Sequence, residues 1–183
     1  MMLNLREIQA EAVRNATEKG FHDEDESPPS AIRQVAWMGL LYSEVSEAID
    51  CLLDDAFDAT IRGDGKPEGL FSELADIVIR ACDSAGALGI DLASERVVAS
   101  WDGFFSQNEP VVNLGLITRD IGRAVEAIRK GEPIGPHLRK VVDTVEDLAE
   151  ETFPRGAQKL KEAIDQKLAY NRTRPRLHGG KRA

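Results

Sequence analysis

The chain has 183 residues, enough for one domain with a substantial hydrophobic core. Its formal net charge of −9 argues against a general nucleic-acid binder, and no apolar run is long enough to span a bilayer. The amphipathic N-terminal segment carries an acid early, unlike a signal peptide, and both cysteines lie in apolar helical stretches typical of buried thiols. We therefore expect a single domain in a reducing, cytoplasmic setting, with no nucleic-acid or membrane partner.

Helical periodicity dominates the first half of the chain. Three helices are predicted there, at about residues 5–19, 31–59 and 68–88. Ser30 is placed to cap the second helix, while Gly20 and Gly89 end the first and the third. An acidic loop with two prolines, residues 21–30, separates the first two helices, and a turn at about residues 61–69 separates the second from the third.

The second half of the chain continues the helical pattern. The segment after Gly89 begins as a helix and becomes a loop at residues 108–110, and three helices follow, at about residues 111–130, 136–152 and 157–173. No segment shows the alternating pattern of a strand. The fold class is therefore predicted to be all-α, a helical bundle. One domain is predicted over residues 1–174, followed by a basic tail at 175–183.

The C-terminal end of the chain is basic on an otherwise acidic protein. From Lys167 onward there are six lysines or arginines and no acid. We favour a tail that folds back to meet phosphate near an acidic site. A solvated tail that aids solubility is the alternative.

Four carboxylates occur as two pairs, each with three-residue spacing in a predicted helix. Glu44 and Glu47 form the first pair, and Glu73 and Asp76 form the second. This spacing places both acids of a pair on one helical face, so two antiparallel helices would direct four acids to one point. Anions held so close repel one another unless a hard cation joins them, and oxygen-only ligands suit Mg²⁺ or Mn²⁺.

The two helices differ in how strongly they support a metal site. On a helical wheel Glu44 interrupts an apolar face between Trp37 and Cys51, where an unpaired glutamate would be costly, so a metal ion or an arginine must compensate it. The third helix is less decisive. Its polar stripe contains Glu73, Asp76, Arg80 and Asp83, which surface ion pairs within the helix would explain equally well.

A faint internal repeat links the two halves. LLYSEVSEAID aligns with LITRDIGRAVE and FSELADIV aligns with LRKVVDTV, so Glu44 and Asp76 correspond to Asp120 and Asp143. The other two acids correspond to bases, Arg123 for Glu47 and Lys140 for Glu73. Because those bases would repel a divalent cation, a duplicated second hairpin is expected to be a packing partner and not a second metal site. A chance alignment of short helical segments is the alternative.

These motifs resemble those of the MazG-like superfamily of all-α nucleoside triphosphate pyrophosphohydrolases, which is related to the dimeric dUTPases. The family signature E-x-x-E…E-x-x-D stands here as the two acid pairs, 25 residues apart. Three further matches are KGFHDE, GKPEG…ELADIVIR…GIDL and, near the C-terminus, KLAYNRTRPRLHGGK. The resemblance covers about residues 5–92 and 164–182, and residues 93–163 look like an insertion or a degenerate second hairpin.

The resemblance implies roles for individual residues. In the family the four acids bind Mg²⁺, so Glu44, Glu47, Glu73 and Asp76 are the expected metal ligands, with Mn²⁺ as a substitute. Glu47, at the rim of the apolar face, is the expected catalytic base. The family's phosphate-contacting residues correspond to Lys167, Asn171 and Arg174, which share one helical face by their spacing, although a frayed, solvated helix is the alternative. His22 lies in the segment where relatives hold the base.

The implied activity is Mg²⁺-dependent hydrolysis of a (deoxy)nucleoside triphosphate to the monophosphate and pyrophosphate, in housecleaning of the nucleotide pool. A dUTP- or dCTP-specific pyrophosphatase is one alternative. A helical module that binds nucleotide, or only interacts with a partner, without catalysis is another. Short relatives assemble their sites by dimerising, so the implied assembly is a homodimer or a pseudo-dimer within one chain.

Overall fold

The computed structural model describes residues 3–22, 28–57, 60–96, 105 and 108–177. Its helices are α1 (Leu5–Glu18), α2 (Ala31–Leu53), α3 (Leu70–Ala87), α4 (Pro110–Lys130), α5 (Gly135–Thr152) and α6 (Gly156–Thr173). Two short strands, β1 (Thr60–Ile61) and β2 (Pro67–Glu68), pair antiparallel between α2 and α3. The predicted all-α class is confirmed, and none of the described helices is both long and apolar enough to cross a membrane.

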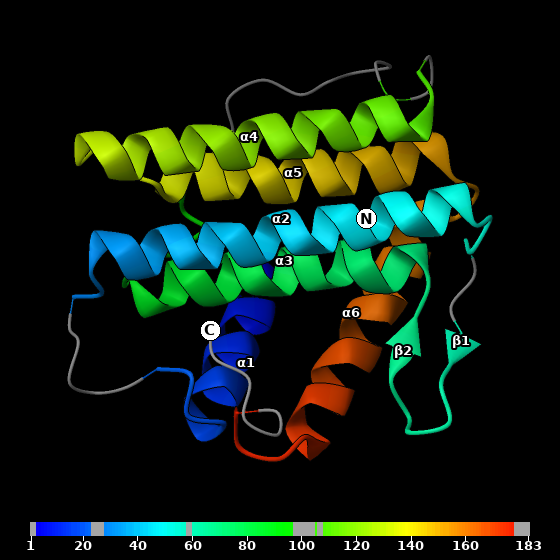
Figure 1. Cartoon of the computed structure of the whole chain (residues 1–183), viewed down its shortest axis with the longest axis horizontal. Coiled ribbons are helices and arrows are strands. Elements are labelled where there is room, and N and C mark those ends of the chain that lie inside the picture. Colours follow the sequence, from blue (N-terminus) through cyan, green and yellow to red (C-terminus); the bar gives the residue numbers. More distant parts are fainter. Residues whose placement is uncertain (1–2, 23–27, 58–59, 97–104, 106–107, 178–183) are drawn as a thin grey trace.

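The bundle is built from two helical hairpins stacked on each other, with two further helices below (Figure 1). The α2/α3 hairpin lies in the middle, with α4 on α2 and α5 on α3. Helices α1 and α6 cover the other side of α3. All six helices contribute side chains to the hydrophobic core. Because α3 packs against α1, α2, α5 and α6, it has neighbours on most of its surface.

Helix α2 ends earlier than the sequence pattern predicts, at Leu53 instead of about residue 59. Asp55 takes a left-handed conformation with φ of 54°, and the Ala56 amide donates to the Cys51 carbonyl across it. Aspartate tolerates this conformation better than most residues, so the DD pair can close the helix.

Two other predictions need correction. The predicted turn between α2 and α3 carries two-residue strands, because Gly65, with φ of 85°, reverses the chain and brings Arg62 and Lys66 into backbone contact. The helix expected after Gly89 is absent from residues 91–96, which form turns, and residues 97–104 lie outside the described part of the chain. The cysteines are both free, with Cys82 buried and Cys51 half-buried.

The junction between α5 and α6 depends on a glycine. A Cβ atom at Gly156 would lie 1.7 Å from the Ala149 carbonyl oxygen, which is backbone and cannot move aside. We predict that Gly156→Ala lowers the free energy of unfolding by about 2 kcal/mol or more, measured by urea denaturation. Gly115→Ala is the control, because that exposed position on α4 has open space, and there alanine should stabilise by about 1 kcal/mol. Equal effects of the two changes would contradict this packing.

Candidate metal centre and adjoining cavity

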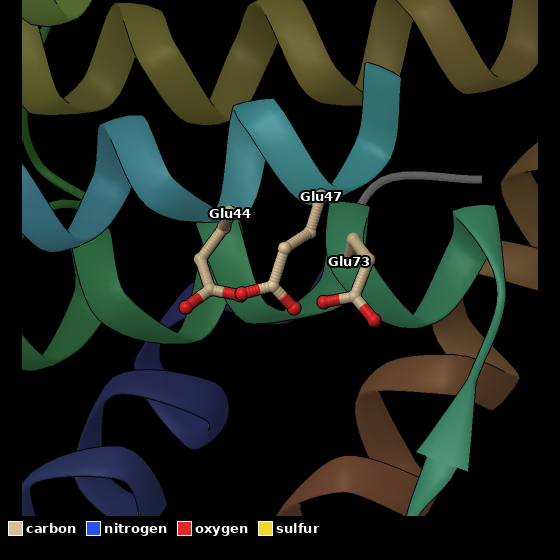
Figure 2. Close-up of side chains that lie close together, drawn as sticks. All are labelled: Glu44, Glu47 and Glu73. Carbon is tan, nitrogen blue, oxygen red and sulfur yellow. The ribbon is translucent and has the colours of Figure 1, made fainter. Parts of the chain in front are cut away.

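Three carboxylates converge between α2 and α3. Glu44 and Glu47 extend from α2 and Glu73 from α3, all to the same side (Figure 2), and one oxygen of each lies within 4.8 Å of the others. Glu44 and Glu73 are each only 4% exposed, whereas Glu47 is exposed at the rim. The prediction that Glu44 interrupts the apolar face of its helix is therefore confirmed.

Glu73 is the least satisfied of these acids. Its Oε2 atom is buried and has no hydrogen-bond partner among the described residues. Burial and the neighbouring carboxylates together raise the pKa of Glu73 to about 7, against the opposing effect of Lys167. The alternative of a solvent-facing stripe on α3 fails for Glu73, because this side chain faces the acids of α2.

Glu44 is paired with a cation from the neighbouring helix. The Nε and Nη2 atoms of Arg80 both lie 2.7 Å from Glu44 Oε1. The sequence pattern suggested that Arg80 pairs within α3, and the structure corrects this, since the guanidinium reaches across to α2. Burial still raises the pKa of Glu44 above its ordinary value, despite the arginine.

Asp76 is paired with a buried lysine and is not one of the three acids whose oxygens lie within 4.8 Å of one another, so the predicted convergence of four acids is seen for three. Lys167 Nζ lies 2.6 Å from Asp76 Oδ2 and 3.9 Å from Glu73 Oε1, and Lys167 is only 2% exposed. Burial lowers the pKa of Lys167, but Asp76 and Glu73 outweigh it and leave the pKa raised, so the lysine stays charged. Lys167 thus contacts the acids directly, where the resemblance implied a phosphate contact.

The charge count of this cluster suits a divalent cation. If all four carboxyl groups, those of Glu44, Glu47, Glu73 and Asp76, are ionised, the two cations Arg80 and Lys167 leave two negative charges uncompensated. Without a metal ion, the raised pKa of Glu73 keeps this acid protonated up to about pH 7. Mg²⁺ prefers such carboxylate oxygens, and the orphaned Glu73 oxygen is a free donor atom for it. The residues therefore fit a metal ion held by Glu44, Glu47 and Glu73.

A cavity of about 180 Å³ adjoins the acid cluster. Asp76, Arg80 and Lys167 line it, and Arg80 and Lys167 also contact the cluster. Its other walls carry aromatic, apolar and polar groups from α1, α2, α3 and α6, and they include Phe21, His22, Trp37, Leu40, Ile79, Asp83, Ser84, Tyr170, Asn171 and Arg174. The cavity is therefore charged where it meets the acids, and its other walls combine aromatic, apolar and polar groups.

The aromatic part of the cavity is organised around His22. Its Nε2 atom lies 2.7 Å from Asp83 Oδ1, and its ring meets Trp37 edge-on at 5.8 Å between centroids. The Arg33 guanidinium lies over the Trp37 ring, 5.8 Å from its centroid. The structure therefore holds His22 in a fixed orientation in the cavity wall, and the residues that hold it were not identified from sequence.

The three residues predicted to contact phosphate share one wall. Lys167, Asn171 and Arg174 all line the cavity, as their spacing on one face of α6 predicts. The chain after α6 returns to α1, where the Leu177 amide donates to the Lys19 carbonyl. The described part of the tail thus folds back, and residues 178–183 lie outside the described chain.

The second hairpin contains buried acids that are already neutralised. Asp120 of α4 is buried, contacts Arg119 and Arg123, and accepts a hydrogen bond from Thr144 of α5. Asp143 pairs with Arg139 one turn away, although its Oδ2 atom, like Glu73 Oε2, is buried with no hydrogen-bond partner among the described residues. Arginines therefore provide here the positive charge that the α2/α3 cluster lacks.

Comparisons of the chain with protein-family models, with curated proteins and with solved structures give no significant match.

The raised pKa of Glu73 predicts a pH dependence of stability in metal-free protein. Between about pH 4.5 and 7 the unfolded chain releases the Glu73 proton while the folded chain retains it, so the free energy of unfolding falls as the pH rises. We predict that Glu73→Gln gains about 2 kcal/mol relative to wild type between pH 5 and 8, measured by urea denaturation with EDTA. Glu126→Gln, which removes an exposed acid with a pKa of about 2, should show no such gain. A Glu73→Gln difference that does not change with pH would contradict this prediction.

Proposed function

We propose that this protein hydrolyses a (deoxy)nucleoside triphosphate to the monophosphate and pyrophosphate with Mg²⁺, and that it is a divergent member of the MazG-like superfamily. The observation that carries the proposal is the convergence of Glu44, Glu47 and Glu73, with a buried Glu73 oxygen that has no hydrogen-bond partner in the part of the chain that the structure describes. The adjoining cavity supports it, because its aromatic walls suit a base and its cationic end suits phosphates.

Each group has a task in the proposed reaction. Bound Mg²⁺, or Mn²⁺ in its place, neutralises phosphate oxygens. Glu47 is exposed at the rim and forms no ion pair with another described residue, so it is the group best placed to accept a proton from the attacking water. Arg174 and Asn171 bind the phosphate chain, and His22 and Trp37 hold the base. Catalysis then depends on positioning and charge.

The cavity size favours a narrower version of the proposal. A cavity of about 150 Å³ accommodates benzene, so about 180 Å³ accommodates a single six-membered ring more readily than a purine. A pyrimidine-specific enzyme acting on dUTP or dCTP is therefore the second candidate.

The proposal also includes the location and the oligomeric state of the enzyme. Free cysteines are in keeping with a cytoplasmic location. Helices α2, α3, α4 and α5 pack as four helices within one chain, which supports an intrachain pseudo-dimer over a homodimer. Light scattering tests this, since a monomeric active species is expected. Activity that appears only in a two-chain assembly with shared sites would contradict it.

Substitution of Glu47 tests the catalytic assignment. We predict that Glu47→Gln lowers kcat by at least roughly 100-fold, because the group that takes the proton is lost, while circular dichroism shows an unchanged helical fold. Asp50→Asn is the matched control, since Asp50 is an exposed acid one turn further along α2, and it should keep full activity. Near-normal turnover in Glu47→Gln would remove this role.

A substrate panel tests the activity itself. Standard and damaged nucleoside triphosphates are incubated with Mg²⁺, and monophosphate and pyrophosphate are measured as products. Release of both from several bases supports the broad enzyme, and release from dUTP or dCTP alone supports the second candidate. If no triphosphate is hydrolysed, a Mg²⁺-induced rise in melting temperature would identify a non-catalytic binding module, and its absence would leave only an interaction bundle.

A further inference from the structure

Arg80 stands between the two parts of the site. Its guanidinium contacts Glu44 of the acid cluster, and the same side chain lines the cavity. The Nε and Nη2 atoms of Arg80 both contact the Oε1 atom of Glu44, and the proposed metal ion needs the same carboxylate. A guanidinium and a divalent cation on one carboxylate repel each other, so they compete for it.

The other cation of the cluster is less free to move. Lys167 is 2% exposed and bonded to Asp76, whereas the Arg80 side chain is 38% exposed. A half-exposed arginine can leave a buried carboxylate without being desolvated, and its planar fork matches two phosphate oxygens. Arg80 is therefore the cation of the cluster that can be transferred to a ligand.

We propose that Arg80 is a shared cation, which neutralises Glu44 in the metal-free protein and binds a substrate phosphate once a divalent ion occupies the acid cluster. This inference rests on the proposed function for the identity of the substrate. The exchange has a reciprocal consequence. Metal binding releases Arg80 for phosphate, and phosphate, by drawing Arg80 from Glu44, strengthens metal binding by the same factor.

The experiment measures metal and phosphate binding separately, without turnover. Calorimetry gives the affinity for Mn²⁺ alone, and then the affinity for inorganic pyrophosphate at saturating Mg²⁺. In Arg80→Gln, Mn²⁺ should bind roughly fivefold more tightly because its competitor is gone. Pyrophosphate should bind roughly tenfold or more weakly because a charge-assisted hydrogen bond is lost. If Arg80 stays on Glu44 as a fixed structural ion pair, Arg80→Gln keeps the wild-type affinity for pyrophosphate at saturating Mg²⁺, and that result would overturn the proposal.

Arg119→Gln is the matched control. Arg119 contacts the buried Asp120 in the second hairpin just as Arg80 contacts Glu44, but it does not line the cavity. Both affinities should stay at the wild-type level. A change in Mn²⁺ affinity equal to that of Arg80→Gln would show a general effect of lost positive charge and would overturn the exchange.

A second measurement uses wild-type protein, in case Arg80→Gln does not fold. The Arg80 Nε–H signal in NMR spectra, assigned by its loss in Arg80→Lys, reports on the bond to Glu44. Saturating Mg²⁺ should shift this signal, and added pyrophosphate should shift it again. A signal that neither addition moves would overturn the proposal.

The test separates this inference from the proposed function. If no nucleoside triphosphate is hydrolysed, tighter Mn²⁺ binding by Arg80→Gln would still establish the competition at Glu44. If hydrolysis occurs while Arg80→Gln keeps wild-type affinity for both Mn²⁺ and pyrophosphate, the proposed enzymatic function is supported and the proposed role of Arg80 as a shared cation is wrong.

Discussion

An unbalanced charge at the α2/α3 interface is the constraint on which the account depends. Four carboxyl groups meet two cations there, and one oxygen of Glu73 is buried with no hydrogen-bond partner among the residues that the structure describes. Burying excess negative charge costs free energy and raises carboxylate pKa values, as it does for Glu73 and Glu44. A divalent cation has the charge that would offset this excess, which is why the proposed metal ion is assigned to this cluster.

The second hairpin shows how the same architecture pairs its buried acids with arginines. Asp120 is as buried as the acids of the first hairpin, but it is neutralised by two arginines and a threonine hydroxyl. This hairpin packs on α2 and α3 and so supports the helices that carry the cluster. The contrast indicates that the open cluster is a specific property of α2 and α3, and is not forced by the bundle.

The fold class, most helix positions and the burial of Glu44 could be predicted from sequence, because apolar spacing and capping residues report directly on local structure. The ion pairs could not. Arg80 lies seven residues after Glu73 on a stripe that suggested pairing within the helix, yet it reaches across to Glu44. Lys167 was placed on the correct face of α6, but its bond to Asp76 depends on how α6 packs on α3. Short-range turn chemistry, with Asp55 in a left-handed conformation, also decided that α2 ends at Leu53.

The central claim is that Glu44, Glu47 and Glu73 come together to hold a divalent ion. The most direct measurement is an anomalous difference map from crystals grown with Mn²⁺. The account predicts a peak within bonding distance of oxygens from all three carboxylates, with Arg80 moved away from Glu44. Well-ordered acids with no peak between them at saturating Mn²⁺, and Arg80 still bound to Glu44, would contradict it.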